Sequence, residues 1–225
     1  MIKSFKSLTK TELIIWSVSV AVVLVSNIIA ETEPITLSAT LVGVTSLIFI
    51  AKGNVVGQFL TVAFSVLYAI TSYRMRYYGE MITYLGMTLP SAVFAAISWI
   101  RHPYKKGEVK ISKMTPLKAV VMVLFTSAAT ALFYFIMKAL DTPNLAVSTL
   151  SITTSFLASY LTFIRNSYYA VAYAVNDIVL IILWILAAIC DISYLPMIFC
   201  FAMFLINDIY GFISWKKREI SQGLK

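Results

Sequence analysis

Residues 204–217 read FLINDIYGFISWKK, an apolar stretch that carries an Asn-Asp pair and ends in Trp215, Lys216 and Lys217. Its last part has a counterpart 116 residues earlier, since ISWIRH at residues 97–102 matches ISWKKR at residues 213–218. A second match precedes it in each half, where SLIFIAKGN at residues 46–54 resembles SYLTFIRNS at residues 159–167. The two matches predict an internal repeat, and the length of the repeat decides how the rest of the chain is divided.

The composition indicates an integral membrane protein. Of the 225 residues, 60% are hydrophobic and only 12% are charged, and the mean hydropathy is +0.87. A bilayer core about 30 Å thick needs a helix of roughly 20 apolar residues. Windows of that length predict eight transmembrane helices, at 12–30, 35–51, 55–73, 79–100, 115–140, 144–164, 166–190 and 192–215. Because the apolar runs are continuous, a transmembrane barrel of alternating strands is excluded.

The repeat divides this all-α membrane protein into two parallel three-helix units, joined by a linker helix and preceded by one extra N-terminal helix. The expected segments are a cytoplasmic N-terminus with the extra helix (1–30), a first repeat (35–100), a cytoplasmic loop with the linker helix (101–140), a second repeat (144–215) and a cytoplasmic tail (216–225). A single linker helix gives both units the same orientation in the membrane, an arrangement that is characteristic of one group of transporters.

The charges predict the orientation of the chain. With both termini in the cytoplasm, only Arg74, Arg76 and Lys138 of the 18 basic residues lie outside. That distribution follows the positive-inside rule. The net charge of +8 is therefore interpreted as a topology signal and as a contact for lipid headgroups, and not as a surface for nucleic acid.

Two predicted helices carry acidic residues inside the membrane. An ionised side chain at the centre of a bilayer helix costs about 2.5–3.5 kcal/mol on insertion scales, so such a residue is a functional candidate by default. Asn176 and Asp177 lie near mid-depth, with Tyr169 and Tyr173 on the same face at helical spacing. A stripe of rings and amides at that depth suits a planar, polar ligand.

The predicted substrate-binding residues are Asn176, Asp177, Tyr173, Tyr169, Asn207, Asp208, Gln58 and Tyr84, and Pro90 is predicted to be a hinge. The amides of Gln58 and Asn207 have the alternative of joining helices, which contributes about 0.6 kcal/mol on average. Trp99, Trp184 and Trp215 are expected at helix ends in the interfacial aromatic belt.

The sequence offers no motif for a metal site, a cofactor or an enzymatic activity. Two cysteines and one histidine do not make a zinc site, and neither a metal nor a cofactor is expected. The chain lacks a phosphate-binding GxxxxGK[ST] loop and the HExxH and GxSxG motifs of hydrolases. A carrier for a small molecule is therefore favoured over an enzyme.

Two stretches resemble the PnuC family of bacterial vitamin transporters. YYGEMITYLGM at residues 77–87 has the family's Tyr-Gly-acid start, and Asn207, Tyr210, Gly211 and Trp215 match its Asn-x-x-Tyr-Gly-x-x-x-Trp ending. The resemblance covers about residues 35–218. It implies a SWEET-like fold in the bacterial inner (plasma) membrane and facilitated uptake of nicotinamide riboside, the NAD precursor. Phosphorylation of the substrate inside the cell would then give the direction.

One departure from the family leaves the substrate open. Family members that take nicotinamide riboside have tryptophans in the penultimate helix, where this chain has Tyr169 and Ala172. Thiamine, riboflavin or a deoxynucleoside is therefore the alternative substrate. Proton coupling through Asp177 or Asp208 and a sensor that binds without transporting are two further alternatives, and a homo-oligomer is compatible with all of them.

Overall fold

The computed structural model describes residues 5–224, and that part of the chain is helical apart from short connections. Eight helices are long and apolar enough to cross a membrane, as predicted. They are α2 (Lys10–Ile29), α3 (Pro34–Ala51), α4 (Val56–Arg74), the unit of α5 (Tyr78–Thr83), η1 (Tyr84–Thr88) and α6 (Leu89–Arg101), α7 (Pro116–Ala139), α8 (Leu145–Phe163), α9 (Tyr169–Ala188), and η3 (Ile192–Tyr194) with α10 (Leu195–Ser221). A short turn, η2 (Lys105–Gly107), lies between α6 and α7.

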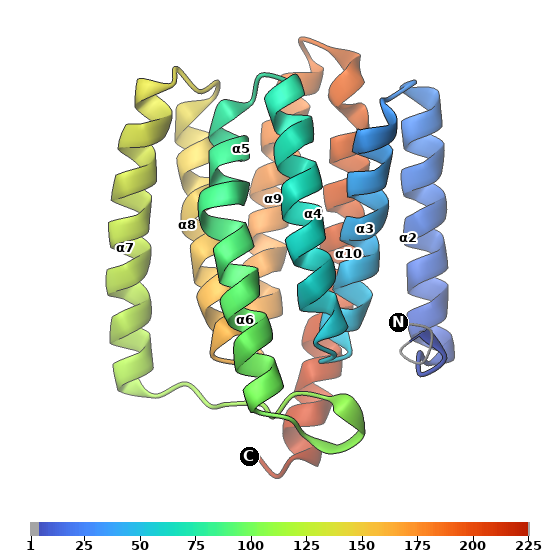
Figure 1. Ribbon diagram of the computed structural model, residues 1–225, viewed down its shortest axis with the longest axis vertical. Helices are drawn as coiled ribbons and strands as arrows, with labels where there is room; N and C mark the ends of the chain where they lie inside the picture. Colours follow the sequence, from blue (N-terminus) through green and yellow to red (C-terminus); the bar gives the residue numbers. More distant parts are fainter. Residues whose placement is uncertain (1–4, 225) are drawn as a thin grey trace.

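Figure 1 shows these helices side by side in one bundle, with both termini at the same end. We call that end, which also carries the α6–α7 connection, the inner end, and the opposite one the outer end. Helix α10 projects beyond the bundle at the inner end, because it continues to Ser221. The predicted tail that begins at residue 216 is therefore helical over most of its length.

Local sequence signals explain where the helices begin and end. Proline occupies the first turn of α3, α7 and α10, where its missing N–H costs no hydrogen bond. Helix α2 begins with a capping box, in which Thr9 and Glu12 each accept a hydrogen bond from the other's backbone N–H. The first helix of each repeat is followed by a residue with left-handed backbone, Gly53 (φ 70°) after α3 and Arg165 (φ 60°) after α8.

The two repeats meet along two seams. Helix α3 packs against α10, and α6 packs against α8, so a helix of the first repeat contacts one of the second at each seam. Helices α2 and α7 lie outside the repeats at opposite edges of the bundle, where α2 packs on α3 and α10 and α7 packs on α8.

Two tryptophans tie the repeats together near the inner end. The indole N–H of Trp99, in the first repeat, donates to the carbonyl of Thr162 in the second at 3.0 Å. Trp215, in the second repeat, donates to the carbonyl of Ile50 in the first at 2.9 Å. The two rings lie 5.4 Å apart. The expected place in an interfacial belt is wrong for Trp99, Trp184 and Trp215, because all three are buried inside the bundle.

The fourth span is interrupted just before Pro90. Residues Tyr84–Thr88 form a π-helical turn, closed by the backbone N–H of Leu89 donating to the carbonyl of Tyr84. Pro90 follows in the first turn of α6 and lacks the N–H that a continuous α-helix would require. Such turns are frequent at functional sites. Whether Pro90 acts as a hinge stays a prediction.

Candidate functional site

A cavity lies between the two repeats, with an empty volume of about 690 Å³, openings included. Its lining combines residues of α3, α4, η1 and α6 with residues of α8, α9 and α10: Ser46, Leu47, Ile50, Gln58, Thr61, Phe64, Tyr84, Thr88, Ser91, Ala92, Ala95, Ser155, Ser159, Thr162, Tyr173, Asn176, Asp177, Phe201, Phe204 and Asp208. Both repeats therefore contribute to one site.

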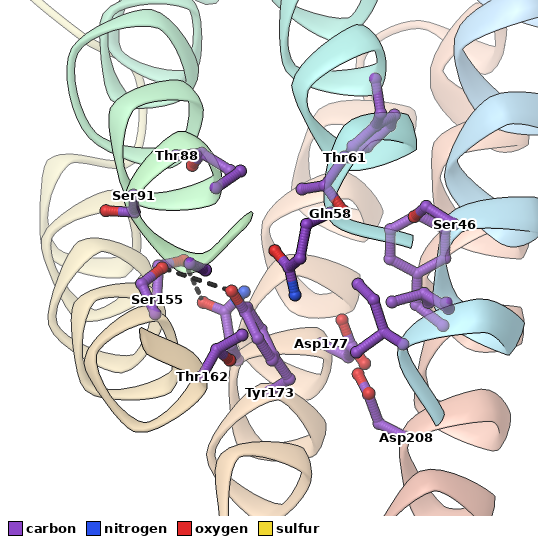
Figure 2. Close-up of a pocket in the computed structure, with 18 of the residues that line it drawn as sticks. Ser46, Gln58, Thr61, Thr88, Ser91, Ser155, Thr162, Tyr173, Asp177 and Asp208 are labelled. Carbon is purple, nitrogen blue, oxygen red and sulfur yellow. Dashed lines mark hydrogen bonds between the residues drawn. The ribbon is translucent and has the colours of Figure 1, made fainter. Parts of the chain in front are cut away.

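Two carboxylates give the cavity its charge. Asp177 on α9 and Asp208 on α10 point toward one another, as Figure 2 shows. They are 2% and 3% exposed, and one oxygen of Asp177 has no hydrogen-bond partner. No Lys, Arg or His is among the described residues that line the cavity. The cavity is thus negatively charged whenever either acid is ionised, and it attracts cations.

Two amides supply hydrogen-bonding groups. The side-chain oxygen of Asn176 accepts hydrogen bonds from Thr154 at 2.8 Å and from Ser155 at 2.9 Å, both on α8. These bonds fix the orientation of the amide and leave its nitrogen to donate to a ligand. Gln58, on α4, is buried and its side-chain nitrogen has no partner. A buried donor without a partner is costly, and a polar ligand would satisfy it.

Aromatic rings form another part of the wall. The ring of Phe64 lies 5.7 Å from that of Tyr84 and 5.5 Å from that of Phe204. The hydroxyl of Tyr173 is 3.3 Å from that of Ser159. Gly43 lets these rings approach α3, because a Cβ there would lie 2.6 Å from the Phe204 ring. The wall can stack on a flat ring while the acids and amides contact its polar groups.

The structure separates the predicted site residues into two groups. Asn176, Asp177, Tyr173, Asp208, Gln58 and Tyr84 line the cavity. Two others lie elsewhere. Asn207 donates to the Ser19 hydroxyl of α2 at 3.0 Å and to the Met203 carbonyl at 2.7 Å. Tyr169 is fully buried, with its ring 4.7 Å from that of Trp215.

Sequence reasoning missed the hydroxyl groups of the cavity. Seven serines and threonines line it: Ser46, Thr61, Thr88, Ser91, Ser155, Ser159 and Thr162. The signal was present in α8, whose sequence LAVSTLSITTSFLASYLTF is rich in hydroxyl side chains for a membrane helix. Such residues pack between helices and hydrogen-bond across them.

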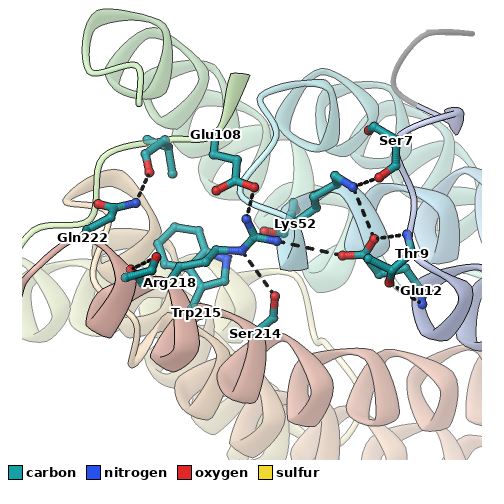
Figure 3. Close-up of polar contacts among 12 residues, drawn as sticks. Ser7, Thr9, Glu12, Lys52, Glu108, Ser214, Trp215, Arg218 and Gln222 are labelled. Carbon is teal, nitrogen blue, oxygen red and sulfur yellow. Dashed lines mark hydrogen bonds and ion pairs between the residues drawn. The ribbon is translucent and has the colours of Figure 1, made fainter. Parts of the chain in front are cut away.

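Ion pairs hold the inner end of the bundle. Glu12, on α2, is buried and lies 3.3 Å from Lys52 and 3.9 Å from Arg218 (Figure 3). Arg218 also pairs with Glu108 of the α6–α7 connection. Since Lys52 follows α3 and Arg218 lies on α10, this network joins the two repeats through a residue of the extra helix.

Known membrane transporters resemble this chain in sequence and in fold. A family model described as nicotinamide mononucleotide transporter matches residues 33–217. The chain is 24% identical over 185 residues to the nicotinamide riboside transporter PnuC of Neisseria mucosa, covering 80% of this chain and 70% of the relative. It is 23% identical over 179 residues to the nicotinamide riboside transporter PnuC of Haemophilus influenzae, covering 78% and 76%. A crystal structure of the vitamin B3 transporter PnuC has the same fold, with a TM-score of 0.81 at 22% identity over 94% of this chain and 92% of that one.

Proposed function

The chain belongs to the nicotinamide mononucleotide transporter family, whose members are transporters and not enzymes, and we propose that it carries nicotinamide riboside by facilitated diffusion. The family is described by the mononucleotide, whereas the two relatives are named for the riboside. The two compounds differ by one phosphate group. The charge of the cavity therefore distinguishes between them.

The acid pair is the observation that carries the proposal. Nicotinamide riboside has a pyridinium ring with one positive charge, and the phosphate of the mononucleotide makes that molecule a net anion near neutral pH. Phosphate sites in proteins use Arg, Lys or helix N-termini. This cavity has Asp177 and Asp208 and no basic side chain among its described lining residues. It thus favours the cationic riboside and repels the phosphate.

The remaining groups suit the other parts of a riboside. Stacking on Tyr84 or Tyr173 would hold the flat ring, and the free amide donors of Asn176 and Gln58 would reach the carboxamide or the ribose hydroxyls. Tyrosine in place of tryptophan still offers an aromatic face to a cation. Thiamine, which is also an organic cation, is the alternative that the same acids would accept.

The two-repeat architecture supports transport by alternating access. The cavity lies between the repeats, and contacts that cross between the repeats close the bundle at its inner end. Rocking of one repeat against the other would open each end in turn. We place the protein in a bacterial inner membrane with both termini in the cytoplasm, supported by the distribution of its basic residues. Phosphorylation of the riboside inside the cell would then make uptake unidirectional.

Proton coupling is a second candidate, favoured by the facing carboxyl groups of Asp177 and Asp208. Two carboxylates at such close range favour sharing a proton, and a cation that enters between them would displace it. A facilitator brings its substrate to equal concentrations on both sides whatever the pH gradient. A coupled carrier would accumulate the riboside, and Asp177→Asn would abolish the accumulation.

Uptake into vesicles that contain the purified protein tests the proposal. Labelled nicotinamide riboside should enter saturably and reach the external concentration with or without a pH gradient. Unlabelled riboside should compete, whereas the mononucleotide at the same concentration should not. If riboside uptake is not saturable but thiamine, riboflavin or a deoxynucleoside is taken up, the substrate is that compound and not the riboside. Competition by the mononucleotide as strong as that by the riboside would refute the charge argument.

A further inference from the structure

A second group of polar side chains, buried except for one half-buried tyrosine, lies between the cavity and the outer end. We call it the outer cluster, and it consists of Tyr68 on α4, Tyr77 and Glu80 at the start of the fourth span, Trp184 on α9 and Tyr194 before α10. Glu80 is the acid of the Tyr-Gly-acid motif in the sequence. None of these five residues lines the cavity described above.

Glu80 is a buried carboxylate without an ion pair. It is 1% exposed, and the hydroxyl of Tyr68 lies beside it without reaching the geometry of a full hydrogen bond. No ion pair to Glu80 occurs in residues 5–224. It lies close enough to the hydroxyls of Tyr68, Tyr77 and Tyr84 to act on them electrostatically. An unpaired acid inside a membrane protein is costly and marks a path for ions or substrates.

Aromatic rings run without a break from the cavity to Glu80 and on to the outer end. Tyr84, which lines the cavity, has its ring 4.1 Å from that of Tyr68, and the Tyr68 ring lies 6.3 Å from that of Trp184. The Trp184 ring is 4.9 Å from that of Tyr77, which lies 5.5 Å from Tyr194. Tyr194 is half-buried, and its hydroxyl donates to the carbonyl of Met75 at 3.2 Å.

Two further polar atoms in the cluster are unsatisfied. The hydroxyl of Tyr68 and the indole N–H of Trp184 are fully buried and have no hydrogen-bond partner. Tyr68 lies between the Glu80 carboxylate and the Trp184 indole, and none of these buried groups makes a hydrogen bond of normal geometry, so a further polar ligand could satisfy them. Aromatic faces around one carboxylate are the chemistry that recognises an organic cation, through cation–π attraction and countercharge together.

We propose that the outer cluster is a second binding site for the cationic ring of the substrate, which the ring occupies on its way between the outer end and the cavity. Glu80 supplies the countercharge, and Tyr68, Tyr77 and Trp184 supply the aromatic faces. The site rests on the proposed function, because it needs a cationic substrate. In this conformation the rings pack against one another, so the site is closed. The π-helical turn that begins at Tyr84 lies one turn after Glu80, and its irregular backbone allows the ring of Tyr84 to change position.

The test compares two ribosides that differ in charge. Nicotinamide riboside is a cation, whereas its reduced form, with a dihydropyridine ring, has nearly the same shape and no charge. In right-side-out vesicles, Glu80→Gln should lower kcat/KM for entry of the cationic riboside at least fivefold. Entry of the reduced riboside should change less than twofold. Asp191→Asn, an exposed acid that caps the turn before α10, is the matched control and should change neither.

Two further measurements separate the outer site from damage to the fold. The equilibrium affinity of purified Glu80→Gln for the riboside should stay within twofold of the parent protein, because the cavity is unaltered. Tyr77→Leu, which keeps the acid and removes an aromatic face, should also slow the cationic riboside more than the reduced one. Equal losses for both ribosides, or no loss for either, would overturn the outer site. No riboside uptake by the parent protein would instead contradict the proposed function.

Discussion

Removing the indole N–H of Trp99 or of Trp215 should favour opening of the bundle at its inner end. Trp99 and Trp215 each donate across a seam between the repeats, to Thr162 and Ile50 respectively. If the repeats separate at this end during transport, these bonds exist only while it is closed. Trp99→Phe and Trp215→Phe should therefore shift the equilibrium toward the state that is open at the inner end.

The structure sets the size of the shift. Neither acceptor carbonyl would be orphaned, because the backbone N–H of Gly53 still donates to Ile50 at 2.8 Å and that of Arg165 to Thr162 at 3.1 Å. The loss is therefore that of one ordinary hydrogen bond, about 0.5–1.5 kcal/mol, and not the larger cost of an unsatisfied group. At RT of about 0.6 kcal/mol this multiplies the open population by about 2 to 13 for each variant. The smaller phenyl ring also weakens packing in the closed state, which acts in the same direction.

A thiol-accessibility assay measures this population. Ser46 lines the cavity, and its hydroxyl bonds only within its own helix, so Ser46→Cys is a suitable probe once Cys190 and Cys200 are replaced. A membrane-impermeant thiol reagent added from the inner side should label it faster in both tryptophan variants. Trp16→Phe is the control, since the Trp16 indole donates to Thr45 at 3.1 Å between α2 and α3 and so does not join the two repeats. Unchanged labelling in both variants, or an equal increase with Trp16→Phe, would refute the reasoning.

Three further substitutions test separate contacts. Gly57→Ala should lower the free energy of unfolding by about 1–3 kcal/mol, seen as a lower melting temperature in a thermal-shift assay, because its Cβ would lie 2.6 Å from the backbone N of Ile50. Gly86→Ala should lower the melting temperature far less, because the nearest neighbour of its Cβ would be 3.5 Å away. Asn176→Ala should weaken riboside affinity about tenfold by calorimetry, the value of one good hydrogen bond to the ligand, whereas Asn207→Ala should leave affinity within twofold. Equal effects would contradict the assignment of Asn176, and not Asn207, to the cavity. Glu12→Gln should destabilise the protein by about 1–3 kcal/mol, because Lys52 loses its ion pair while Arg218 keeps the one with Glu108. The exposed pair of Glu33 with Arg74 should contribute less than about 1 kcal/mol when Glu33→Gln is made.

Much of the fold could be predicted because the determinants are local. Span length follows from apolar length, and proline in the first turn of several helices marks where they begin. The repeat was visible in Ile-Ser-Trp, and the structure gives the physical reason. Each copy of that tryptophan makes the same kind of hydrogen bond to the opposite repeat, so the motif has a role at the seam in both halves.

The same tryptophans show what sequence position cannot predict. A tryptophan near a helix end can lie at the lipid interface or pack between helices. Only the packing of the other repeat decides which of the two occurs. The π-helical turn could likewise not be predicted from local sequence. Pro90 indicated a break in the helix, but its form and its exact place depend on how the chain before it packs. Long-range packing, and not local preference, determined both outcomes.

The two Asn-Asp pairs, on α9 and α10, have different surroundings that local sequence does not predict. Adjacent residues on a helix point about 100° apart, so a pair contacts one cavity only where that cavity covers a wide arc of the helix. On α9 both Asn176 and Asp177 line the cavity. On α10 only Asp208 does, because Asn207 donates a hydrogen bond to Ser19 of the extra helix α2. Both acids thus belong to the second repeat, while Gln58 and Tyr84 belong to the first. If the repeats rock as rigid bodies, the acid pair and its cationic ligand move together, and the contacts that must break and form again are those with Gln58 and Tyr84.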